Sequence, residues 1–324
     1  MSEARPATGE ARGEIVGAGL LAHVPTIVLP EETRRELNEG HEISLVPGLR
    51  TLRADVFETL DYDTVVVLDS HWATTVEFVV SAHPRRAGLF TSEELPRGMC
   101  RMPYDYPGDP ELAHSVARFA EKHGTWITPI DDPFLPVYYA TINLWTYLGH
   151  GLPEKKWVSI GVCQTGDVED HLRLGRALAD GIGALPGRKV LLIASGALSH
   201  TFWPLRELRA HEASDASHIR TPEARAADRQ RIEWFERGDH AQVLRTMPEF
   251  LTHKPEARFG HYLMMIGALG EERCTAAGRP YSAYENSVGT GQIHLWFDRP
   301  ADGWTGTGTG TNTATGTGPK EAVA

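Results

Sequence analysis

Residues 64–72 combine an unbroken run of β-branched and apolar residues with a polar cluster, in the sequence TVVVLDSHW. Because the apolar run is continuous and does not alternate with polar residues, it predicts a strand that is buried on both faces, as in the centre of an α/β sheet. Ligands of open α/β sheets bind beyond the carboxyl ends of the strands. The pattern therefore places His71 where such a fold holds its chemistry.

A second apolar run, residues 15–21, ends just before His23, and Pro25 is expected to end the strand pairing there. Residues 44–59 lie between the two runs and have the apolar spacing of a helix. A strand, a helix and a parallel strand in this order form a βαβ unit, in which both strands end at the same edge of the sheet. We therefore expect His23 and His71 to lie on neighbouring strand ends.

The rest of the chain continues the alternation of strands and helices. Apolar segments predict further strands at residues 76–81, 157–163, 190–194 and 292–297, and helices at residues 110–123, 168–185, 220–250 (as a pair) and 259–269. The strand at 190–194 leads to His200, a third histidine beyond a strand end. Residues 85–106 are rich in proline, glycine and charge, so we expect a long loop of the kind that often covers a binding site.

These elements predict an α/β fold. We expect a single domain with a central mixed or parallel sheet, flanked by helices, and an active site at the carboxyl ends of the strands. We assign this catalytic domain to residues 14–300. The polar leader 1–13 and the Gly/Thr-rich tail 301–324 are expected to be disordered and to carry no function.

The charge balance argues against nucleic acid and anionic membranes as partners, because the chain has 43 acidic and 32 basic residues and a formal net charge of −11. Its three cysteines are widely spaced and odd in number, which suits a reducing compartment. The first residues lack an apolar signal core, and no apolar run approaches the roughly 18 residues of a membrane span. We therefore expect a cytoplasmic enzyme.

The strand-end histidines suggest a metal site. A mononuclear non-haem iron site uses two neutral imidazoles and a carboxylate on one face, and leaves positions open for substrate and oxygen. His23 and His71, with a carboxylate from a third segment, match this requirement, although each histidine alone also fits a surface or core role. His200 suits a general base or a structural loop cap. Ser195 and Ser199 precede it without the G-x-S-x-G pattern of a hydrolase nucleophile.

Six motifs then follow one another between residues 15 and 298. They are A-H-V-P around His23, V-x-x-D-S-H-W around His71, T-S-x-E-L-P at 91–96, A-S-G-x-L-S-H ending at His200, the Glu256 segment that runs into M-x-x-G-A-L-G, and G-T-G-Q at 289–292. Together they resemble the motifs of the LigB-type (class III) extradiol catechol dioxygenases. The motif at 91–96, with the Y-D-Y of residues 104–106, is most like the homoprotocatechuate (3,4-dihydroxyphenylacetate) 2,3-dioxygenase branch.

The resemblance implies an enzyme that uses Fe(II), or alternatively Mn(II), to insert both atoms of O2 into a catechol and form a muconic semialdehyde. Residue by residue, it implies that His23, His71 and Glu256 ligate the metal and that His200 is the acid/base residue. Many family members have a second active-site histidine in a D-H-G-T segment, where this chain has Y-Y-A-T, so Tyr139 is expected to take that place. The implied substrate is 3,4-dihydroxyphenylacetate, and the implied assembly is a dimer or tetramer.

Other functions stay open at this point. The same chemistry on another catechol or on a 2-aminophenol is the first alternative to 3,4-dihydroxyphenylacetate. A non-enzymatic binding protein on the same fold is a second alternative, because a fold alone does not confer function. A hydrolase with Zn(II) at the same residues is a third. The sequence does not identify the residue that binds the ring substituent.

Overall fold

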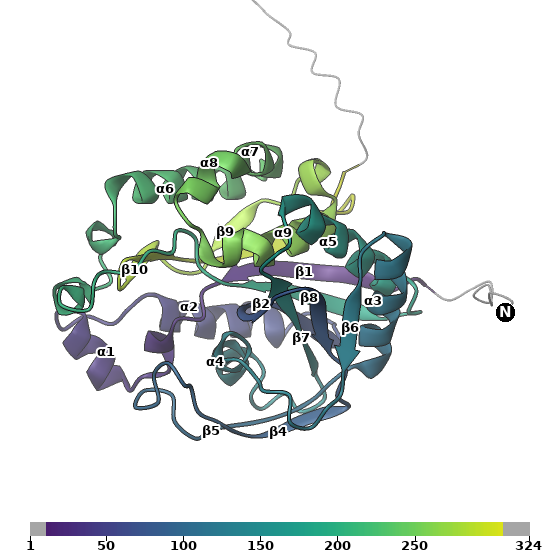
Figure 1. Cartoon of the computed structure of the whole chain (residues 1–324), viewed down its shortest axis with the longest axis horizontal. Coiled ribbons are helices and arrows are strands. Elements are labelled where there is room, and N and C mark those ends of the chain that lie inside the picture. Colours follow the sequence, from purple (N-terminus) through teal and green to yellow (C-terminus); the bar gives the residue numbers. More distant parts are fainter. Residues whose placement is uncertain (1–10, 307–324) are drawn as a thin grey trace, which may run out of the picture.

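The computed structural model describes residues 11–306, and an eight-stranded sheet lies at its centre (Figure 1). Its strands are β1 (Glu14–Leu21), β2 (Thr64–Thr74), β3 (Phe78–Ser81), β6 (Ile127–Ile130), β7 (Lys156–Cys163), β8 (Lys189–Ser195), β9 (Gly278–Pro280) and β12 (His294–Asp298), in the order β6-β3-β7-β2-β8-β1-β12-β9. The central strands β7, β2, β8 and β1 are parallel. β3 and β12 pair antiparallel with β7 and β1, so the sheet is mixed, as predicted.

Helices cover both faces of this sheet (Figure 1). One face carries α3 (Pro110–Lys122), α5 (Val168–Gly183) and α9 (Gly260–Leu269), and the other carries α2 (Leu45–Leu52) and α4 (Tyr139–Leu148). In β2, Val66 and Leu68 pack into the first core, and Val65 and Val67 pack into the second. Burying each such side chain contributes about 1.5–3 kcal/mol. The continuous apolar run therefore forms a strand buried on both faces, which confirms the prediction.

Smaller elements complete the fold. They are α1 (Glu31–Leu37), α6 (Pro222–Glu236), α7 (His240–Arg245), α8 (Met247–Thr252), a π-helical turn (Arg53–Phe57) after α2, 3-10 turns at Pro25–Val28, Leu208–His211, Ala216–His218, Glu256–Phe259 and Glu271–Arg273, the hairpin β4 (Arg85–Phe90) and β5 (Met102–Pro107), and the pair β10 (Glu285–Ser287) and β11 (Thr290–Gln292). Within residues 11–306, no helix has the length and apolarity needed to cross a membrane. Residues 1–10 of the expected leader and 307–324 of the expected tail lie outside the described residues.

Three predictions about the fold were wrong in detail. β8 lies between β1 and β2, so these two strands share an edge of the sheet without being neighbours. Residues 85–106 contain the antiparallel hairpin β4–β5, and only residues 91–101 form its loop. The expected helix pair at 220–250 is three helices. The first of them ends before Gly238, whose φ of 68° lies in the left-handed region that glycine adopts most readily.

β2 contains a bulge close to its carboxyl end. Its register with β7 shifts between Asp69 and Ala73. The Oδ1 atom of Asp69 accepts hydrogen bonds from the backbone N–H groups of His71 and Trp72, each at 2.9 Å. These bonds replace ladder partners that the bulge removes. The side chain of Asp69 therefore fixes the backbone of His71 within the strand, whereas the sequence predicted His71 beyond the strand end.

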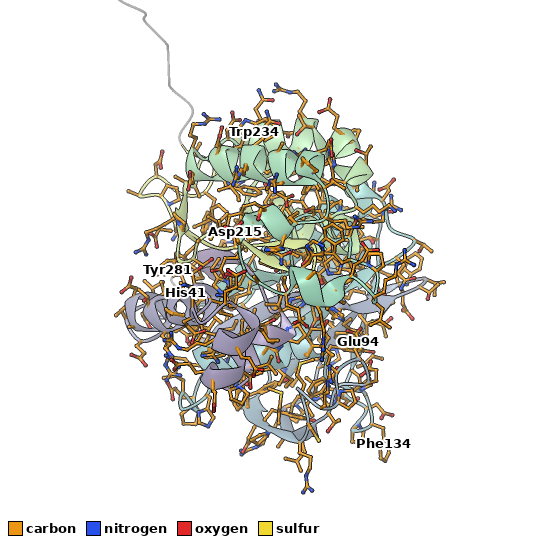
Figure 2. All side chains as sticks on the ribbon, turned by 90° about the vertical axis from the view of Figure 1, so that its left-hand side faces the viewer. His41, Glu94, Phe134, Asp215, Trp234 and Tyr281 are labelled. Atoms are coloured by element: carbon orange, nitrogen blue, oxygen red, sulfur yellow. The ribbon has the colours of Figure 1, made fainter. Side chains whose placement is uncertain are left out.

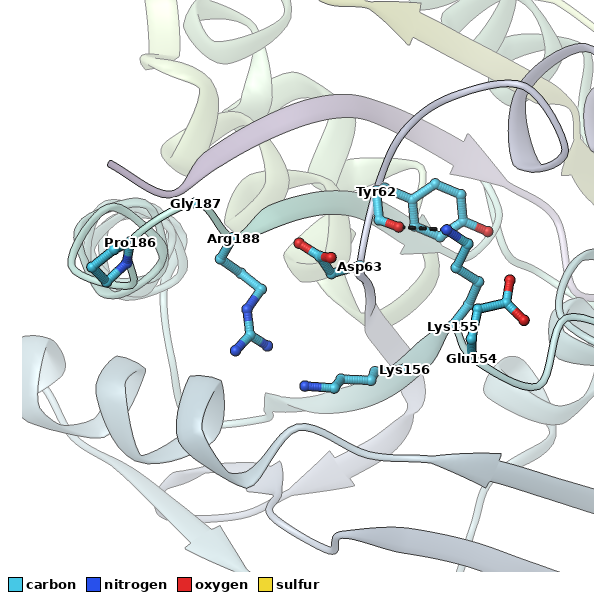
Figure 3. A pocket seen from close by; sticks show the side chains of 8 residues that line it. All are labelled: Tyr62, Asp63, Glu154, Lys155, Lys156, Pro186, Gly187 and Arg188. Carbon is cyan, nitrogen blue, oxygen red and sulfur yellow. Dashed lines mark hydrogen bonds between the residues drawn. The ribbon is translucent and has the colours of Figure 1, made fainter. Parts of the chain in front are cut away.

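A cavity of about 460 Å³ lies at the amino edge of the sheet, away from the carboxyl ends of the strands (Figure 3). Its basic side chains already have partners. Lys155 Nζ donates to the carbonyl of Tyr62 at 2.6 Å. Arg188 is paired with Asp109, and Lys156 Nζ lies 3.8 Å from the same carboxylate. We assign this cavity a structural role, because α/β sheets bind ligands at the carboxyl ends of their strands.

Candidate metal centre

The carboxyl edge of the sheet brings His23, His71 and Glu256 together. One ligand atom of each lies within 4.8 Å of the others. Oε1 of Glu256 is 3.4 Å from Nε2 of His23 and 3.8 Å from Nε2 of His71. His23 follows β1, His71 lies in the bulge of β2, and Glu256 begins the 3-10 turn that precedes α9. Three segments far apart in the sequence therefore converge on one point.

Ser195, the last residue of β8, determines which nitrogen of His23 faces this point. Its hydroxyl donates to the carbonyl of Ala140 at 2.9 Å, so its single proton is already used. Ser195 Oγ therefore accepts a hydrogen bond from Nδ1 of His23, at 3.0 Å. A proton on Nδ1 leaves the lone pair on Nε2, the atom near Glu256. Metal-binding histidines are commonly oriented by such an outer hydrogen bond.

His71 lies between Glu256 and Tyr139, the first residue of α4. The Tyr139 hydroxyl contacts Nε2 of His71 and donates to Oε2 of Glu94 at 3.2 Å, and the rings of His71 and Tyr139 are 4.0 Å apart. Burial, followed by the charge of His23, lowers the pKa of His71, which favours the neutral imidazole that a metal requires. Burial and the nearby Glu94 carboxylate raise the pKa of Tyr139, so its phenol keeps its proton at neutral pH.

Glu256 is buried, and both of its carboxylate oxygens accept hydrogen bonds. Ser70 Oγ donates to Oε1 at 2.7 Å, and the backbone N–H of Ala197 donates to Oε2 at 2.6 Å. Burial by itself would raise the pKa of this carboxyl group, but the imidazoles of His23 and His200 lower it well below its usual value. The centre therefore combines an ionised carboxylate with imidazole nitrogens.

The turn that carries Glu256 has an unusual backbone. Ala257, Arg258 and Phe259 have φ values of 46°, 55° and 65°, in a region that costs a non-glycine residue roughly 1–2 kcal/mol. A hydrogen bond of 3.1 Å from the Glu256 N–H to the carbonyl of Leu198 helps to hold the turn in place. Strain of this kind persists where the surrounding structure enforces it, and it concentrates at functional sites.

The donor set suits a divalent transition metal. Two imidazole nitrogens and one carboxylate oxygen match the 2-His-1-carboxylate arrangement, in which the remaining positions are available to substrate and oxygen. The three residues line a cavity of about 150 Å³, to which Val24 and Phe202 contribute apolar surface. The centre therefore has both a metal-binding set and an adjacent space for a small molecule.

His200 lines the same cavity. Its backbone N–H donates to the carbonyl of Lys254 at 3.0 Å, and its ring packs edge-on against Phe202 with centroids 4.7 Å apart. The preceding residue, Ser199, is fixed by the buried Asp228. One carboxylate oxygen of Asp228 accepts from Ser199 N at 3.0 Å, and the other accepts from Ser199 Oγ at 2.6 Å. Asp228 therefore holds the segment that carries His200 beyond the end of β8.

All of the site residues expected from the sequence line this one cavity: His23, His71, Tyr139, His200 and Glu256. Their chemical roles stay predictions. Sequence analysis did not assign roles to Ser70, Ser195 or Asp228. The first two had a signal, because each is a polar residue at a strand end within a motif that also contains an expected site residue. Asp228 had none, because its contact with Ser199 depends on how α6 packs.

A Ser195→Ala variant is expected to weaken metal binding by about 10–100-fold, the range seen when outer hydrogen-bond partners of metal ligands are removed. The variant leaves Nδ1 of His23 without its acceptor, so the ring is free to turn or to change tautomer. Metal titration followed by equilibrium dialysis measures this affinity. Ser115→Ala is the matched control, since Ser115 is equally buried and donates to the carbonyl of Gly181 on the far side of the sheet. Equal affinities for both variants would contradict the orienting role of Ser195.

Comparisons with known proteins agree with this site. A family model described as "Catalytic LigB subunit of aromatic ring-opening dioxygenase" matches residues 17–295. The 3,4-dihydroxyphenylacetate 2,3-dioxygenase of Escherichia coli is 27% identical over 263 residues, which cover 81% of this chain and 92% of that protein. The crystal structure of an uncharacterised protein of Escherichia coli K12, JW3007, aligns with a TM-score of 0.59 at 16% identity and covers 87% of this chain and 99% of that chain. At that identity, the structural likeness supports the fold alone.

The family match covers most of the chain and includes all of the motifs that surround the centre. LigB dioxygenases depend on a metal, and the described residues provide a His-His-Glu group that could hold one. The chain therefore belongs to the LigB family and is an extradiol dioxygenase, an enzyme that opens an aromatic ring with O2.

Proposed function

We propose that the chain is an Fe(II)-dependent dioxygenase that inserts both atoms of O2 into a catechol and releases a muconic semialdehyde. The convergence of His23, His71 and Glu256 at the wall of a small cavity carries this proposal. 3,4-Dihydroxyphenylacetate is the reference substrate, because the Escherichia coli relative is named for it. Both oxygen atoms of O2 enter the product, so the reaction needs no external reductant.

His23, His71 and Glu256 would hold the iron. Bound Fe(II) would supply Lewis acidity to the two catechol hydroxyls and a route for electrons between the ring and O2. The chain's own contribution is an ionised carboxylate held by two hydrogen bonds, the His23 imidazole oriented by Ser195, and the neutral imidazole of His71. Mn(II) would suit the same donors.

His200 would move the protons. As general base it would accept the proton of the second catechol hydroxyl at an imidazole nitrogen, and as general acid it would return that proton to oxygen as the ring opens. Its position in the cavity and the hydrogen bonds that fix the backbone at Ser199 and His200 support this role. Tyr139 keeps its phenol proton, and on substrate binding it would redirect the hydrogen bond that it donates to Glu94 toward the substrate or oxygen in the same cavity.

The decisive experiment is anaerobic reconstitution with Fe(II), followed by admission of oxygen in the presence of 3,4-dihydroxyphenylacetate, protocatechuate, catechol or 2-aminophenol. We expect a yellow product and one O2 consumed per ring opened, measured by visible absorbance and an oxygen electrode. Parallel samples with Mn(II) and Zn(II) identify the metal. A chain that binds no metal would favour a binding protein on the same fold. Turnover without oxygen would favour a Zn(II) hydrolase.

We also propose a cytoplasmic homo-oligomer, a dimer or tetramer, as the family resemblance implies. Cys100, Cys163 and Cys274 are all unpaired, which suits a reducing compartment. Light scattering on the metal-loaded protein would measure the assembly directly.

A further inference from the structure

The charge of the cavity constrains the substituent that a catechol can carry. Among the described residues that line the cavity, there are two carboxylates, Glu94 and Glu256, but no lysine or arginine. Proteins usually recognise a substrate carboxylate with one of these cations, most often in a bidentate pair with arginine. Glu256 belongs to the metal centre, so Glu94 is the charge that a ring substituent would meet.

Glu94 is held at this position by its own loop. Ser92, which is fully buried, accepts hydrogen bonds from the backbone N–H groups of Glu94 and Leu95 at 3.2 and 3.3 Å. Met99 is also fully buried, and its N–H donates to the carbonyl of Leu95 at 2.9 Å. The loop therefore fixes Glu94 between a buried serine and a buried methionine, at the tip of the β4–β5 hairpin.

The carboxylate of Glu94 faces the catalytic side chains. Oε1 lies 3.7 Å from Nδ1 of His71, and Oε2 accepts from Tyr139 at 3.2 Å. Its side chain is 52% exposed, so it stands at the mouth of the cavity and not at its base. In Figure 2 it is labelled on the near face of the molecule, between Asp215 above and Phe134 below. A second carboxylate arriving there would meet a like charge.

Gln292 adds a second acceptor to the cavity wall. Its amide nitrogen donates to Thr290 Oγ1 at 2.7 Å, and that hydroxyl in turn donates to the carbonyl of Ser287 at 2.7 Å. The only hydroxyl proton of Thr290 is already donated to Ser287, so Thr290 can only accept from the side chain of Gln292. The side-chain amide of Gln292 therefore cannot be flipped, and its oxygen is left as an acceptor. This oxygen is buried and has no hydrogen-bond partner among the described residues. The Gln292 oxygen is thus available to a ligand that donates a hydrogen bond.

We propose that the substrate is a catechol whose side chain is cationic or uncharged and carries N–H donors, and that Glu94 selects against a carboxylate at this position. The inference rests on the proposed iron-dependent cleavage of a catechol, and it replaces the reference substrate, 3,4-dihydroxyphenylacetate, with a catechol that carries no carboxylate. It departs from the name of the 27% identical relative, whose substrate carries a carboxylate, and it does so although Glu94 belongs to the motif at 91–96 that resembles the same branch. An ammonium or amide group would satisfy the acceptors that the cavity presents, whereas a carboxylate would leave them unpaired and add repulsion.

Three catechols of similar shape test the charge preference: 3,4-dihydroxyphenethylamine, 3,4-dihydroxyphenylacetamide and 3,4-dihydroxyphenylacetate. Two quantities are measured for each with the Fe(II)-loaded protein, the dissociation constant under anaerobic conditions and kcat/KM with oxygen. We expect the amine and the amide to have dissociation constants at least about tenfold lower than the carboxylate, and kcat/KM values at least about tenfold higher. A carboxylate that binds as well as the isosteric amide would overturn the inference.

A Glu94→Gln variant tests the residue itself. It is expected to reduce the preference for amide over carboxylate by about tenfold, because the repulsion is removed while the side-chain shape is kept. Glu93→Gln is the matched control, since Glu93 is exposed in the same loop and does not line the cavity. The Glu93→Gln variant should show the same preference for amide over carboxylate as the unaltered protein. Equal preferences in the two variants would exclude Glu94 as the selecting residue.

The two measurements also separate this inference from the proposed function. If no catechol consumes oxygen, the proposed function fails, while the anaerobic dissociation constants still rank the three charges. If oxygen is consumed but the carboxylate is preferred, the proposed function stands and the inference fails.

Discussion

Replacing Glu256 with glutamine is expected to leave the fold intact and to abolish metal binding. The glutamine oxygen can accept from the Ala197 N–H, and its NH2 group can donate to Ser70, whose hydroxyl is able to turn. What disappears is the anionic oxygen near the Nε2 atoms of His23 and His71. We expect the metal affinity to fall by more than about a hundredfold, which exceeds the loss caused by removing a hydrogen-bond partner of a metal ligand. Ring cleavage should then fall to background.

Metal content after gel filtration and the thermal unfolding of the metal-free protein test this expectation together. Glu285→Gln is a suitable control, because Glu285 is 7% exposed against 6% for Glu256 and accepts a hydrogen bond from the Ser44 N–H at 2.6 Å, outside the cavity. The control should retain the metal. A Glu256→Gln protein with normal metal content would remove Glu256 from the ligand set. A control that also loses the metal would show that the loss follows from disturbing any buried carboxylate.

The central sheet could be predicted because burial on two faces leaves a simple mark on the sequence. Every residue from Val65 to Leu68 is apolar, since successive side chains enter cores on opposite faces. The same pattern marked the runs before His23 and His200. Parallel strands end at a common edge, so the meeting of these histidines followed from the strand assignment, even though the order of β1, β8 and β2 did not.

Other parts of the centre left no local signal. Glu256 reaches the histidines through a turn with left-handed φ values at Ala257, Arg258 and Phe259, and nothing about these residue types predicts that conformation. α4 is buried over most of its length, so it lacks the polar stripe by which a surface helix is recognised. Glu256 and Tyr139 could therefore be placed in the site only through the family resemblance.

The hairpin β4–β5 shows a third reason for a missed element. β4 is largely exposed and has the sequence RRAGLF, and β5 contains two prolines, so neither has a clean alternation of apolar and polar residues. Their pairing depends on each other and on the core below. The consequence for function is that Glu94, at the tip of a paired hairpin, has a defined position that an irregular loop would not provide.

Replacing His200 with phenylalanine is expected to slow turnover by about 10²–10⁴-fold while one metal stays bound per chain. The substitution removes both ring nitrogens but keeps a planar ring that can pack against Phe202. The backbone bond to Lys254 and the two bonds from Ser199 to Asp228 do not involve the side chain of His200, so the segment should keep its path. Steady-state kcat and metal content measure the two effects separately.

The pH dependence of kcat distinguishes a proton-transfer role of His200 from a packing role. If His200 carries the proton, the limb of the profile that reports its ionisation should vanish in the His200→Phe variant, whereas a packing defect would lower kcat at every pH without changing the shape. His114→Phe, on the exposed side of α3, is the control for exchanging a histidine for phenylalanine and should leave both kcat and the profile unchanged. Unchanged turnover in the His200→Phe variant would exclude His200 from the chemistry, and loss of the metal would assign it to the ligand set. If His200 is the general acid/base, the His200→Phe variant must be slow, must keep one metal per chain and must lose this limb of its pH profile.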